Sequence, residues 1–460
     1  MGFAVASHHL FNRRGYSSGV ESVLLYLVGI VVVVIGLAIS IALHEWGHFV
    51  PAKLFGVRVG QFMIGFGRTV FSWRRGETEF GVKWLPLGGY ISMAGMYPPV
   101  AGKAARTAST SIFGTLVQDA RDASADTVVD GEEHRTFYRL PVYQRIIIML
   151  GGPFMNLVIA VVLYAVVLMG FGIAQPSTTL GSVSACALPA TSERQECSTD
   201  DPLAPGAEAG LQPGDRIVSI DGARIDSWNS VLGLVRDAAG EPLDVQVARG
   251  EATVRTTVTP LLTERYVLDD GGQIAESANG DLLTEQVGFI GIGPAVETVR
   301  QPAAAVLPAV GDNVSAVVGI IANLPQRLID VAEAAFGPEE RDPNGPISIV
   351  GVGRIAGEVV SIDTIPVVER VAFLVGLLAS LNVALFVFNL VPLLPLDGGH
   401  IAGALIESLR RWFAKLRGKP DPGPLDTARL VPVTLAVVIV LGLMSALLIY
   451  ADIVKPVNLF

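Results

Sequence analysis

The chain has 460 residues and a formal net charge of −10, because 43 Asp and Glu outnumber 33 Lys and Arg. Apolar residues make up 51% of the chain and charged residues 17%, whereas soluble domains average about 25% charged residues. These values exclude a disordered chain and a coiled coil, and the acidic balance argues against a nucleic-acid partner. The 2 cysteines are too few for a disulfide-built scaffold. We expect a membrane protein with at least one water-exposed module.

Four apolar runs are long enough to cross a bilayer, which takes about 20 residues in a helix. They are residues 23–43, 146–173, 373–396 and 430–451. The first run follows Arg13 and Arg14, as the apolar part of a signal peptide would. It is longer than the usual ~7–15 residues of that part, and it ends in a polar motif instead of a cleavage site. We therefore predict about four retained spans.

The charges of the connecting segments predict how the chain is oriented. Residues 51–145 hold 12 basic and 8 acidic side chains, and residues 397–429 hold 6 and 4. Residues 174–370 hold 12 basic and 28 acidic side chains. Because basic loops tend to stay in the cytoplasm, we expect the first two segments to be cytoplasmic and the third, with both chain ends, to be extracytoplasmic.

Strand patterns lie on both sides of the second predicted span. Residues 57–62 and 78–83 alternate apolar and polar side chains, which predicts a membrane-associated β-hairpin. An edge of this hairpin could hold an opened substrate chain, or the hairpin could have a packing role alone. Residues 98–135 are rich in Ala, Ser, Thr, Asp and Gly, which is typical of a flexible cytoplasmic insert.

The predicted extracytoplasmic segment contains short strands separated by turns. Residues 210–222 contain a turn, then alternating apolar residues, then a second turn. Residues 243–247 and 253–258 alternate as strands, residues 230–239 resemble a short helix, and residues 287–292 are a possible returning strand. This pattern resembles a bacterial PDZ domain, which would bind extended peptides or chain ends at a sheet edge. A small β-rich domain without a ligand is the alternative.

Two further features of the same segment allow more than one interpretation. Cys186 and Cys197 could form a disulfide in an oxidising compartment, or they could remain two thiols. Residues 301–335 combine Ala, Val and Ile with sparse charge and several prolines. They predict either an interfacial amphipathic helix or a packed connector.

The motif His44-Glu45-Trp46-Gly47-His48 at the end of the first span carries the sharpest chemical signal. Two imidazoles four residues apart share one face of a helix and can bind one Zn²⁺. Glu45 could then take a proton from a water activated by the metal. A solvated helix end is the alternative, but charged groups beside a span are costly, about 2.5–3.5 kcal/mol at mid-helix on insertion scales.

A catalytic zinc takes three protein ligands and keeps one position open, so a third ligand is expected elsewhere. Pro392 and Pro395 must interrupt the helix of the third span. Irregular backbone at membrane depth is tolerated where it is buried in protein or lines a wet cavity. Asp397, followed by two glycines, is the natural carboxylate ligand, and His400 beyond the glycines is a weaker competitor.

These segments together resemble the site-2 proteases, zinc metalloproteases that cut within membranes, and specifically the bacterial regulator of sigma-E protease type with extracytoplasmic PDZ domains. The resemblance covers nearly the whole chain. It rests on His44-Glu45-x-x-His48, Gly152-Pro153-Phe154-Met155-Asn156, and Asn389 with Leu396-Asp397-Gly398. Residues 86–90 and 344–348 also look like segments of that family, whereas Leu394 replaces a proline that the family often has.

The resemblance implies roles for five residues and a class of substrate. His44, His48 and Asp397 would bind Zn²⁺, Glu45 would be the catalytic base, and Asn389 would hold substrate or the oxyanion. Substrates would be single-span membrane proteins, such as anti-sigma factors already trimmed outside, or remnant signal peptides. The location would be the bacterial cytoplasmic membrane, with the active site near its cytoplasmic side.

The predicted fold is therefore a polytopic α-helical membrane protein of about four spans, with a membrane-associated β-hairpin region and an extracytoplasmic α+β PDZ domain. We predict nine segments, at residues 1–56 (first span), 57–97 (hairpin), 98–144 (insert), 145–173 (second span), 178–293 (PDZ), 294–370 (connector), 371–400 (third span), 401–429 (cytoplasmic loop) and 430–453 (fourth span). Two other functions remain as alternatives. One is a membrane-anchored PDZ adaptor with a non-catalytic zinc site, and the other is a zinc transporter, which spans two and four disfavour because they carry almost no polar groups.

Overall fold

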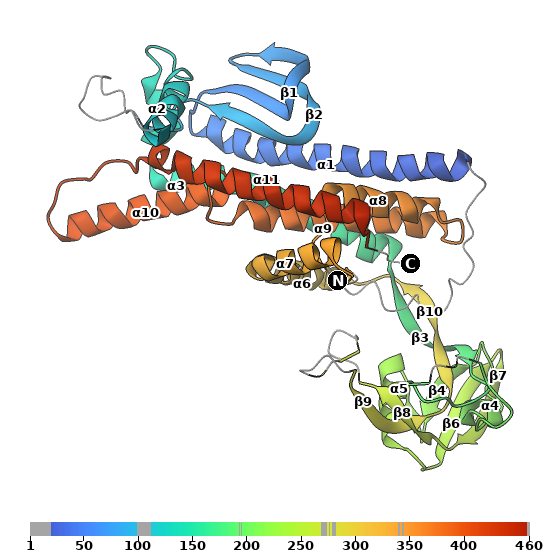
Figure 1. The fold of residues 1–460 in the computed structure, drawn as a ribbon. Helices are drawn as coiled ribbons and strands as arrows, with labels where there is room; N and C mark the ends of the chain where they lie inside the picture. The colour runs from blue at the N-terminus through green and yellow to red at the C-terminus, as the bar shows by residue number, and fades with distance from the viewer. Residues whose placement is uncertain are drawn as a thin grey trace. The chain divides into compact units, whose positions relative to one another are not determined.

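The computed structural model describes residues 20–98, 112–192, 194, 196–267, 274–275, 277, 282–338, 341–342 and 345–457. The chain divides into two compact units (Figure 1). Arg13–Phe171 and Pro302–Leu459 form the first, which we call the helical unit. Gly172–Gln301 is the body of the second, which we call the strand-rich unit.

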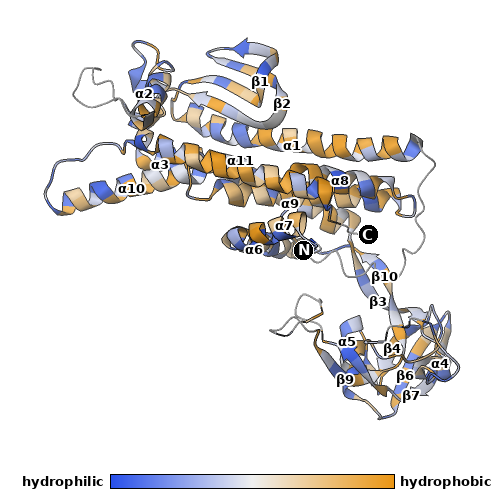
Figure 2. Ribbon diagram, viewed as in Figure 1, coloured by the Kyte–Doolittle hydropathy of each residue, from blue (hydrophilic) through white to orange (hydrophobic). Residues whose placement is uncertain are grey.

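Long apolar helices build the helical unit (Figure 2). Among the described residues, five of them are long and apolar enough to cross a membrane: Glu21–Leu54, Val142–Phe171, Ala303–Ala322, Val367–Asn389 and Thr427–Val454. Large apolar side chains on the last of them point outward, with Leu443 67% exposed. A helix with this surface is stable in lipid rather than in water. The chain is thus a multi-pass membrane protein.

The helices are named as in Figure 1. They are α1 (Val20–Leu54), α2 (Ile112–Ala125), α3 (Val142–Ala165), α6 (Val306–Ala322), α7 (Leu324–Phe336), α8 (Ile349–Ser361), α9 (Val367–Asn389), α10 (Asp397–Leu416) and α11 (Val431–Val454). A π-helical turn, Val166–Phe171, extends α3.

Helix α6 lies where an extracytoplasmic connector was predicted. Its Val310 is buried in one apolar cluster with Ala160 of α3 and Val383 of α9. Its apolar face packs against two neighbouring helices, which favours the packed segment over the interfacial helix. It is also the candidate span beyond the four that were predicted.

The third predicted span, residues 373–396, is interrupted as its two prolines require. Helix α9 ends at Asn389, and α10 begins at Asp397. Between them the chain turns without regular helix, since a proline lacks the N–H that a continuing helix needs. This interruption places Asp397 in the first turn of a new helix.

Strands β1 (Val59–Arg75) and β2 (Thr78–Met93) form the predicted hairpin, and both are longer than the predicted strands at 57–62 and 78–83. Each strand is bent, and different parts of it pair with different parts of the other strand. Ile64 of β1 pairs both with Gly89 and with Val82 of β2. Two bent strands thereby produce four paired segments. Aromatic contacts hold this sheet to α1, with the Phe49 and Phe62 ring centroids 5.7 Å apart.

The insert predicted to be flexible contains helix α2, so that prediction is wrong for residues 112–125. Phe113, Leu116, Val117 and Ala120 recur at helical spacing, a pattern that the many small residues around them obscure. The Arg121 guanidinium lies 2.6 Å from Asp426 beyond α10, which fixes the helix to the rest of the unit. Residues 99–111 of the same insert lie outside the described residues.

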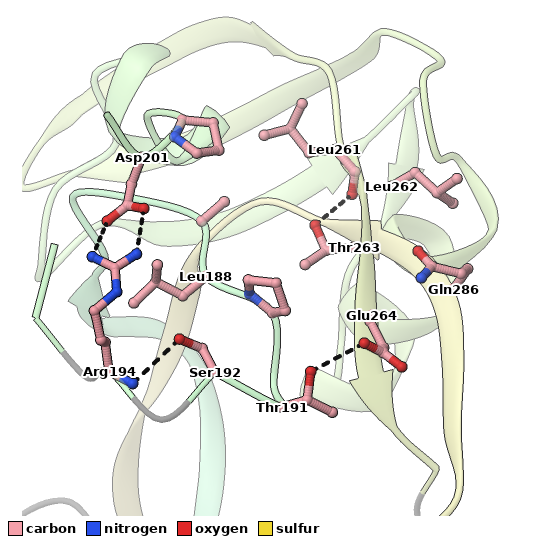
Figure 3. A pocket seen from close by; sticks show the side chains of 13 residues that line it. Leu188, Thr191, Ser192, Arg194, Asp201, Leu261, Leu262, Thr263, Glu264 and Gln286 are labelled. Carbon is pink, nitrogen blue, oxygen red and sulfur yellow. Dashed lines mark hydrogen bonds and ion pairs between the residues drawn. The ribbon is translucent and has the colours of Figure 1, made fainter. Parts of the chain in front are cut away.

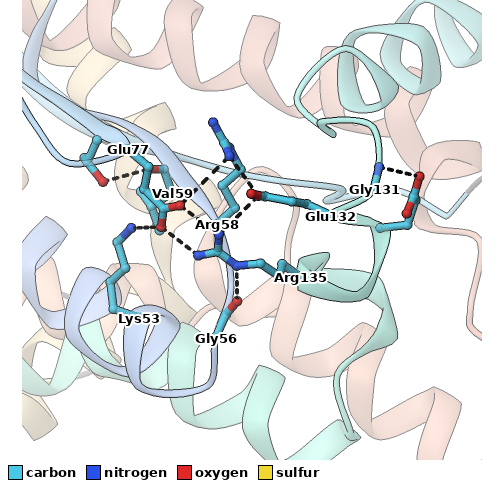
Figure 4. A network of polar contacts seen from close by, with 10 residues as sticks. Lys53, Gly56, Arg58, Val59, Glu77, Gly131, Glu132 and Arg135 are labelled. Atoms are coloured by element: carbon cyan, nitrogen blue, oxygen red, sulfur yellow. Dashed lines mark hydrogen bonds and ion pairs between the residues drawn. The ribbon is translucent and has the colours of Figure 1, made fainter.

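A network of charged side chains ties the hairpin turn to the end of α1 (Figure 4). Glu77 in the turn accepts hydrogen bonds from both terminal nitrogens of Arg135, at 2.7 and 2.8 Å. Lys53 near the end of α1 also donates to Glu77. Arg58 pairs with Glu132 at 2.7 Å. The Arg135 guanidinium and Lys53 lower the pKa of Glu77 to about 2.

The strand-rich unit contains a sheet in the order β10-β3-β4-β6-β7, with β5 beside β4 and a separate β8–β9 pair. The strands are β3 (Ile173–Val183), β4 (Arg216–Ile220), β5 (Ala223–Arg224), β6 (Leu243–Arg249), β7 (Ala252–Val258), β8 (Leu261–Tyr266), β9 (Thr284–Phe289) and β10 (Ile292–Val299). Helices α4 (Pro205–Glu208) and α5 (Trp228–Asp237) complete the unit.

This unit confirms most of the predicted local structure. The three predicted strands are β4, β6 and β7, and the predicted short helix is α5, which Ser227 caps by accepting from the Ser230 N–H. The predicted returning strand is divided between β9 and β10 at Gly291, whose φ of +75° suits glycine. Cys186 and Cys197 form a disulfide, which decides between the two alternatives.

We expect Glu77→Gln to destabilise the protein in a pH-dependent way. The folded pKa of Glu77 lies below its ordinary value of 4.5. The carboxylate therefore stabilises the fold above that value, and its contribution is lost as pH falls toward 2. At pH 7 the variant should melt about 1 °C lower, the effect of about 1 kcal/mol on a chain of this length, and the difference should shrink below pH 4.5.

Thermal unfolding of the detergent-solubilised protein at several pH values measures this difference. Glu79→Gln is the matched control on the same hairpin, because the Glu79 carboxylate lies 3.4 Å from the Gln61 amide and therefore gains little from that contact. A difference for Glu77→Gln that stays constant from pH 7 to pH 3 would contradict the assignment.

Candidate active site

Two helices distant in the sequence bring together the three predicted metal ligands. His44 and His48 lie one turn apart on α1, and their Nε2 atoms are 3.2 Å apart. Asp397 in the first turn of α10 places Oδ2 3.4 Å from His44 Nε2 and 3.3 Å from His48 Nε2. These side chains form a group that could hold a metal ion.

The geometry of this group fits zinc. Ligands about 2.0–2.1 Å from a tetrahedral zinc ion are separated by about 3.3–3.4 Å, as these three donor atoms are. Asp397 Oδ2 is buried without a hydrogen-bond partner in the described structure, which is costly for a carboxylate that binds no cation. Two imidazoles and one carboxylate also match the donor set of catalytic zinc, which leaves one position open.

Helix α3 orients both imidazoles. His48 Nδ1 lies 2.7 Å from the backbone oxygen of Ile148. His44 Nδ1 lies 3.0 Å from the side-chain amide of Asn156, a residue that is 0% exposed. A histidine that binds metal through Nε2 keeps a proton on Nδ1, and a partner for that proton fixes the orientation of the ring. The Ile148 carbonyl can accept this proton from His48. Asn156 can do the same for His44 when its amide is turned to present Oδ1, which is buried without a hydrogen-bond partner in the described structure.

Glycines allow α3 to approach α1 closely enough for these contacts. A Cβ atom on Gly47 would lie 2.1 Å from the Gly151 oxygen, and one on Gly151 would lie 2.0 Å from the Gly47 oxygen. A Cβ atom on Gly152 would lie 2.2 Å from His48 Nε2 and 2.7 Å from His44 Nε2. The space that the metal needs exists because residue 152 has no side chain.

A buried ion pair connects α10, the helix of the third ligand, to the same helix α3. Arg145 at the start of α3 donates to Glu407 of α10 at 2.5 Å. Glu407 is 0% exposed and also accepts from Arg411 at 3.0 Å and from the Leu425 N–H at 2.9 Å. Its charge is therefore compensated. Helix α3 contacts or orients every element that supplies a predicted ligand.

Glu45 lies on α1 beside the two histidines and is 8% exposed. The backbone of β2 covers it, because a Cβ atom on Gly89 would lie 2.9 Å from Glu45 Cγ. A carboxylate held next to a metal and shielded from bulk water has the position that a general base requires. The strand that covers it comes from Pro86-Leu87-Gly88-Gly89-Tyr90, which the sequence had marked as a family segment.

Two other residues predicted for the site, Asn389 and His400, lie outside the group of three metal ligands. Asn389 is the last residue of α9, and its side-chain amide donates to the Leu385 carbonyl at 2.9 Å. His400, the competing ligand, lies in α10 but does not belong to the group that could hold a metal. Asn344 of the other family segment lies outside the described residues.

The motif Gly152-Pro153-Phe154-Met155-Asn156 has a role here that the family resemblance does not specify. Asn156 lies against His44, and a side chain at residue 152 would meet both imidazoles. The sequence showed this motif as a family segment. Its contacts depend on the crossing of α3 with α1, and the spacing of residues within the motif does not predict that crossing.

The chain is similar to known metalloproteases over most of its length. The family model described as Peptidase family M50 matches residues 32–420. The Zinc metalloprotease Rip1 of Mycobacterium tuberculosis is 34% identical over 446 residues, covering 95% of this chain and 100% of the relative. Rip1 of Mycolicibacterium smegmatis is 30% identical over 452 residues, with 95% and 100% covered. The Metalloprotease MmpA of Caulobacter vibrioides is 30% identical over 403 residues, with 84% and 88% covered.

We expect Gly152→Ala to lose zinc. The added methyl group would occupy the space between the two Nε2 atoms, so the affinity for zinc should fall by more than tenfold, as it does when groups next to a metal site are altered. Metal analysis of the purified protein, with competition by a chelator, measures this loss.

Gly170→Ala is the matched control, because an added Cβ there meets nothing within 4 Å in the described structure. This variant should bind zinc as the wild type does. Equal zinc affinity of Gly152→Ala and wild type would show that the ion, if bound, lies elsewhere.

Proposed function

This chain belongs to peptidase family M50, the site-2 proteases, and is a zinc metalloprotease, so we propose that it hydrolyses peptide bonds inside the membrane-spanning segments of single-span proteins. One observation carries the proposal. The group of His44, His48 and Asp397 lies beside Glu45 on a helix apolar enough to cross a membrane. Polar groups at such a place are retained for chemistry rather than for packing.

In the proposed mechanism, His44, His48 and Asp397 hold the zinc ion. A zinc ion held there would supply Lewis-acid chemistry, which acidifies water and polarises a carbonyl. Glu45 takes the proton from the attacking water and returns it to the leaving amide nitrogen. Asn156 and the Ile148 carbonyl keep the imidazoles in one orientation during this cycle, and the strand over Glu45 limits the access of bulk water to the base.

We propose that the sheet formed by β1 and β2 binds the substrate segment in an extended conformation. An amide inside a helix is protected by its own hydrogen bonds, so the substrate helix must unwind before it is cut. Residues 89–93 of β2 pair with β1 along one edge, and in the described structure no strand pairs with the other edge. That edge begins at Gly89, next to Glu45. An extended substrate could pair there.

The finer identity of the substrate follows from the family resemblance. We propose that substrates are anti-sigma factors after a first cleavage, or remnant signal peptides, in regulated intramembrane proteolysis. We further propose that the strand-rich unit is a PDZ domain outside the bacterial cytoplasmic membrane, where it binds chain ends or admits shortened substrates. The acidic excess of residues 174–370 supports this side, and the basic loops support an active site near the cytoplasm.

A membrane-anchored PDZ adaptor with a non-catalytic zinc site is the alternative function. The donor set with an open position and the neighbouring Glu45 disfavour it. A wild-type protein that holds zinc and cleaves no membrane segment under any condition would favour it.

We expect Glu45→Gln to keep zinc and to lose cleavage, by about 10²–10⁴-fold, because a general base contributes that much. Membranes from cells that express wild type or variant should differ in small transmembrane fragments, which accumulate with the variant. Mass spectrometry of these fragments is the measurement.

Glu21→Gln, in the first turn of the same helix, is the control and should behave as wild type. Full cleavage by zinc-loaded Glu45→Gln would reject the mechanism.

We expect Asn389→Ala to slow cleavage by about 10²-fold, the cost of removing one donor that stabilises an oxyanion, while zinc content stays unchanged. The same fragments and the zinc content of the purified variant are the readouts. Asn313→Ala is the control, since Asn313 bonds to Ser380 within the same bundle. Equal cleavage by Asn389→Ala and wild type would remove Asn389 from the mechanism.

A further inference from the structure

We propose that the outer edge of β8, together with the pocket beside it, is a binding site for an extended, uncharged polypeptide segment. The site lies within the strand-rich unit. It is distinct from α5 and β10, neither of which lines it, and the inference does not depend on the proteolytic function.

The pocket has a volume of about 690 Å³ and lies between β8 and the loop that the disulfide closes (Figure 3). Leu188, Thr191 and Arg194 belong to the loop side. On the other side, four consecutive residues of β8 line it, from Leu261 to Glu264. Successive side chains of a strand point to opposite faces. A pocket lined by four in a row therefore runs along the edge of the strand.

The edge of β8 that faces the pocket carries backbone groups that point away from its partner strand β9. Antiparallel strands alternate residues that bond to the partner strand with residues that point outward. Glu264 points outward, because its carbonyl accepts from the Ala190 N–H at 3.0 Å. Leu262, two residues earlier, points the same way. Among the described residues, no hydrogen bond is formed by the backbone of Leu262 or by the N–H of Glu264 beyond the strand pair.

These three groups match the main chain of one extended segment. A residue opposite Leu262 would exchange two hydrogen bonds with it, and the next carbonyl along would accept from the Glu264 N–H. The Ala190 N–H occupies the Glu264 carbonyl, so the bound segment would pair with the Leu262 N–H, the Leu262 carbonyl and the Glu264 N–H alone. Main-chain pairing with pockets for alternate side chains is how sheet edges bind peptides.

The side chains around the edge favour an uncharged segment. Arg194 and Asp201 neutralise each other through bonds of 3.2 and 2.8 Å. Glu264 accepts from the Thr191 and Thr284 hydroxyls. Glu264 keeps its negative charge, but both of its oxygens already have hydrogen-bond donors, and the remaining lining offers apolar contact from side chains such as Leu188 and Leu262. Small apolar side chains on the bound segment would make contact with this part of the lining.

The test uses the full-length protein in detergent and the peptide acetyl-(Val-Thr)₃-amide, which is uncharged and strongly strand-forming. Hydrogen exchange followed by mass spectrometry locates the peptide. We expect the amides of Leu261–Tyr266 to exchange at least tenfold more slowly when the peptide is present. Anisotropy of a fluorescein-labelled copy of the peptide gives the affinity.

Two substitutions at one position separate backbone from side-chain recognition. Leu262→Pro removes the outward N–H, which has no partner in the described structure, and proline is tolerated on a strand edge. It should weaken peptide binding at least tenfold. Leu262→Ala keeps the N–H and should change binding by less than threefold. Unchanged exchange of the β6 and β7 amides shows that Leu262→Pro is folded.

Ser192→Trp fills the pocket from the loop side and gives a second variant if Leu262→Pro does not fold. It should also weaken binding at least tenfold. The proposal is overturned by equal binding to wild type and Leu262→Pro, by protection confined to β10 and α5, by full binding to Ser192→Trp, or by absence of peptide binding to the wild type.

Discussion

The close contact between the backbones of α1 and α3 is the constraint on which the active site depends. At Gly47 and Gly151 the helices touch without intervening side chains. That approach places the Ile148 carbonyl and the Asn156 amide within hydrogen-bonding distance of the two imidazoles. It also leaves space beside Gly152 for an ion. In lipid, where apolar side chains gain little by associating with each other, small residues at helix crossings are the usual means of close packing.

A different physical cause places the third ligand, Asp397, at this crossing. A span that continued as one helix through residues 390–396 would carry Asp397 onward along its own axis. The prolines end α9, and the chain turns into α10, so the carboxylate lies at the start of a new helix. A helix N-terminus favours a negatively charged side chain. The irregular segment, the new helix and the ligand are thus one feature, and the prolines are its cause.

Local patterns in the sequence predicted the chemical groups well. The histidine spacing, the glycines after Asp397 and the prolines before it are short-range signals, and the structure brings the three ligands together as they suggest. Contacts between distant segments were not predictable. Arg145 and Glu407 are 262 residues apart, and neither lies in a recognisable motif. Helix α2 was missed because small residues conceal its apolar face, and the role of Asn156 was missed because motif spacing does not tell which helices cross.

The fully buried Glu407 restricts which parts of the bundle can move apart. Breaking a buried ion pair by separating its partners typically costs about 3–5 kcal/mol, and this carboxylate also accepts from Arg411 and from the chain at Leu425. We therefore expect helices α3 and α10 to move together, as one rigid body, when the enzyme admits and releases substrate. A gate that admits a substrate from the lipid would then have to open elsewhere than between α3 and α10.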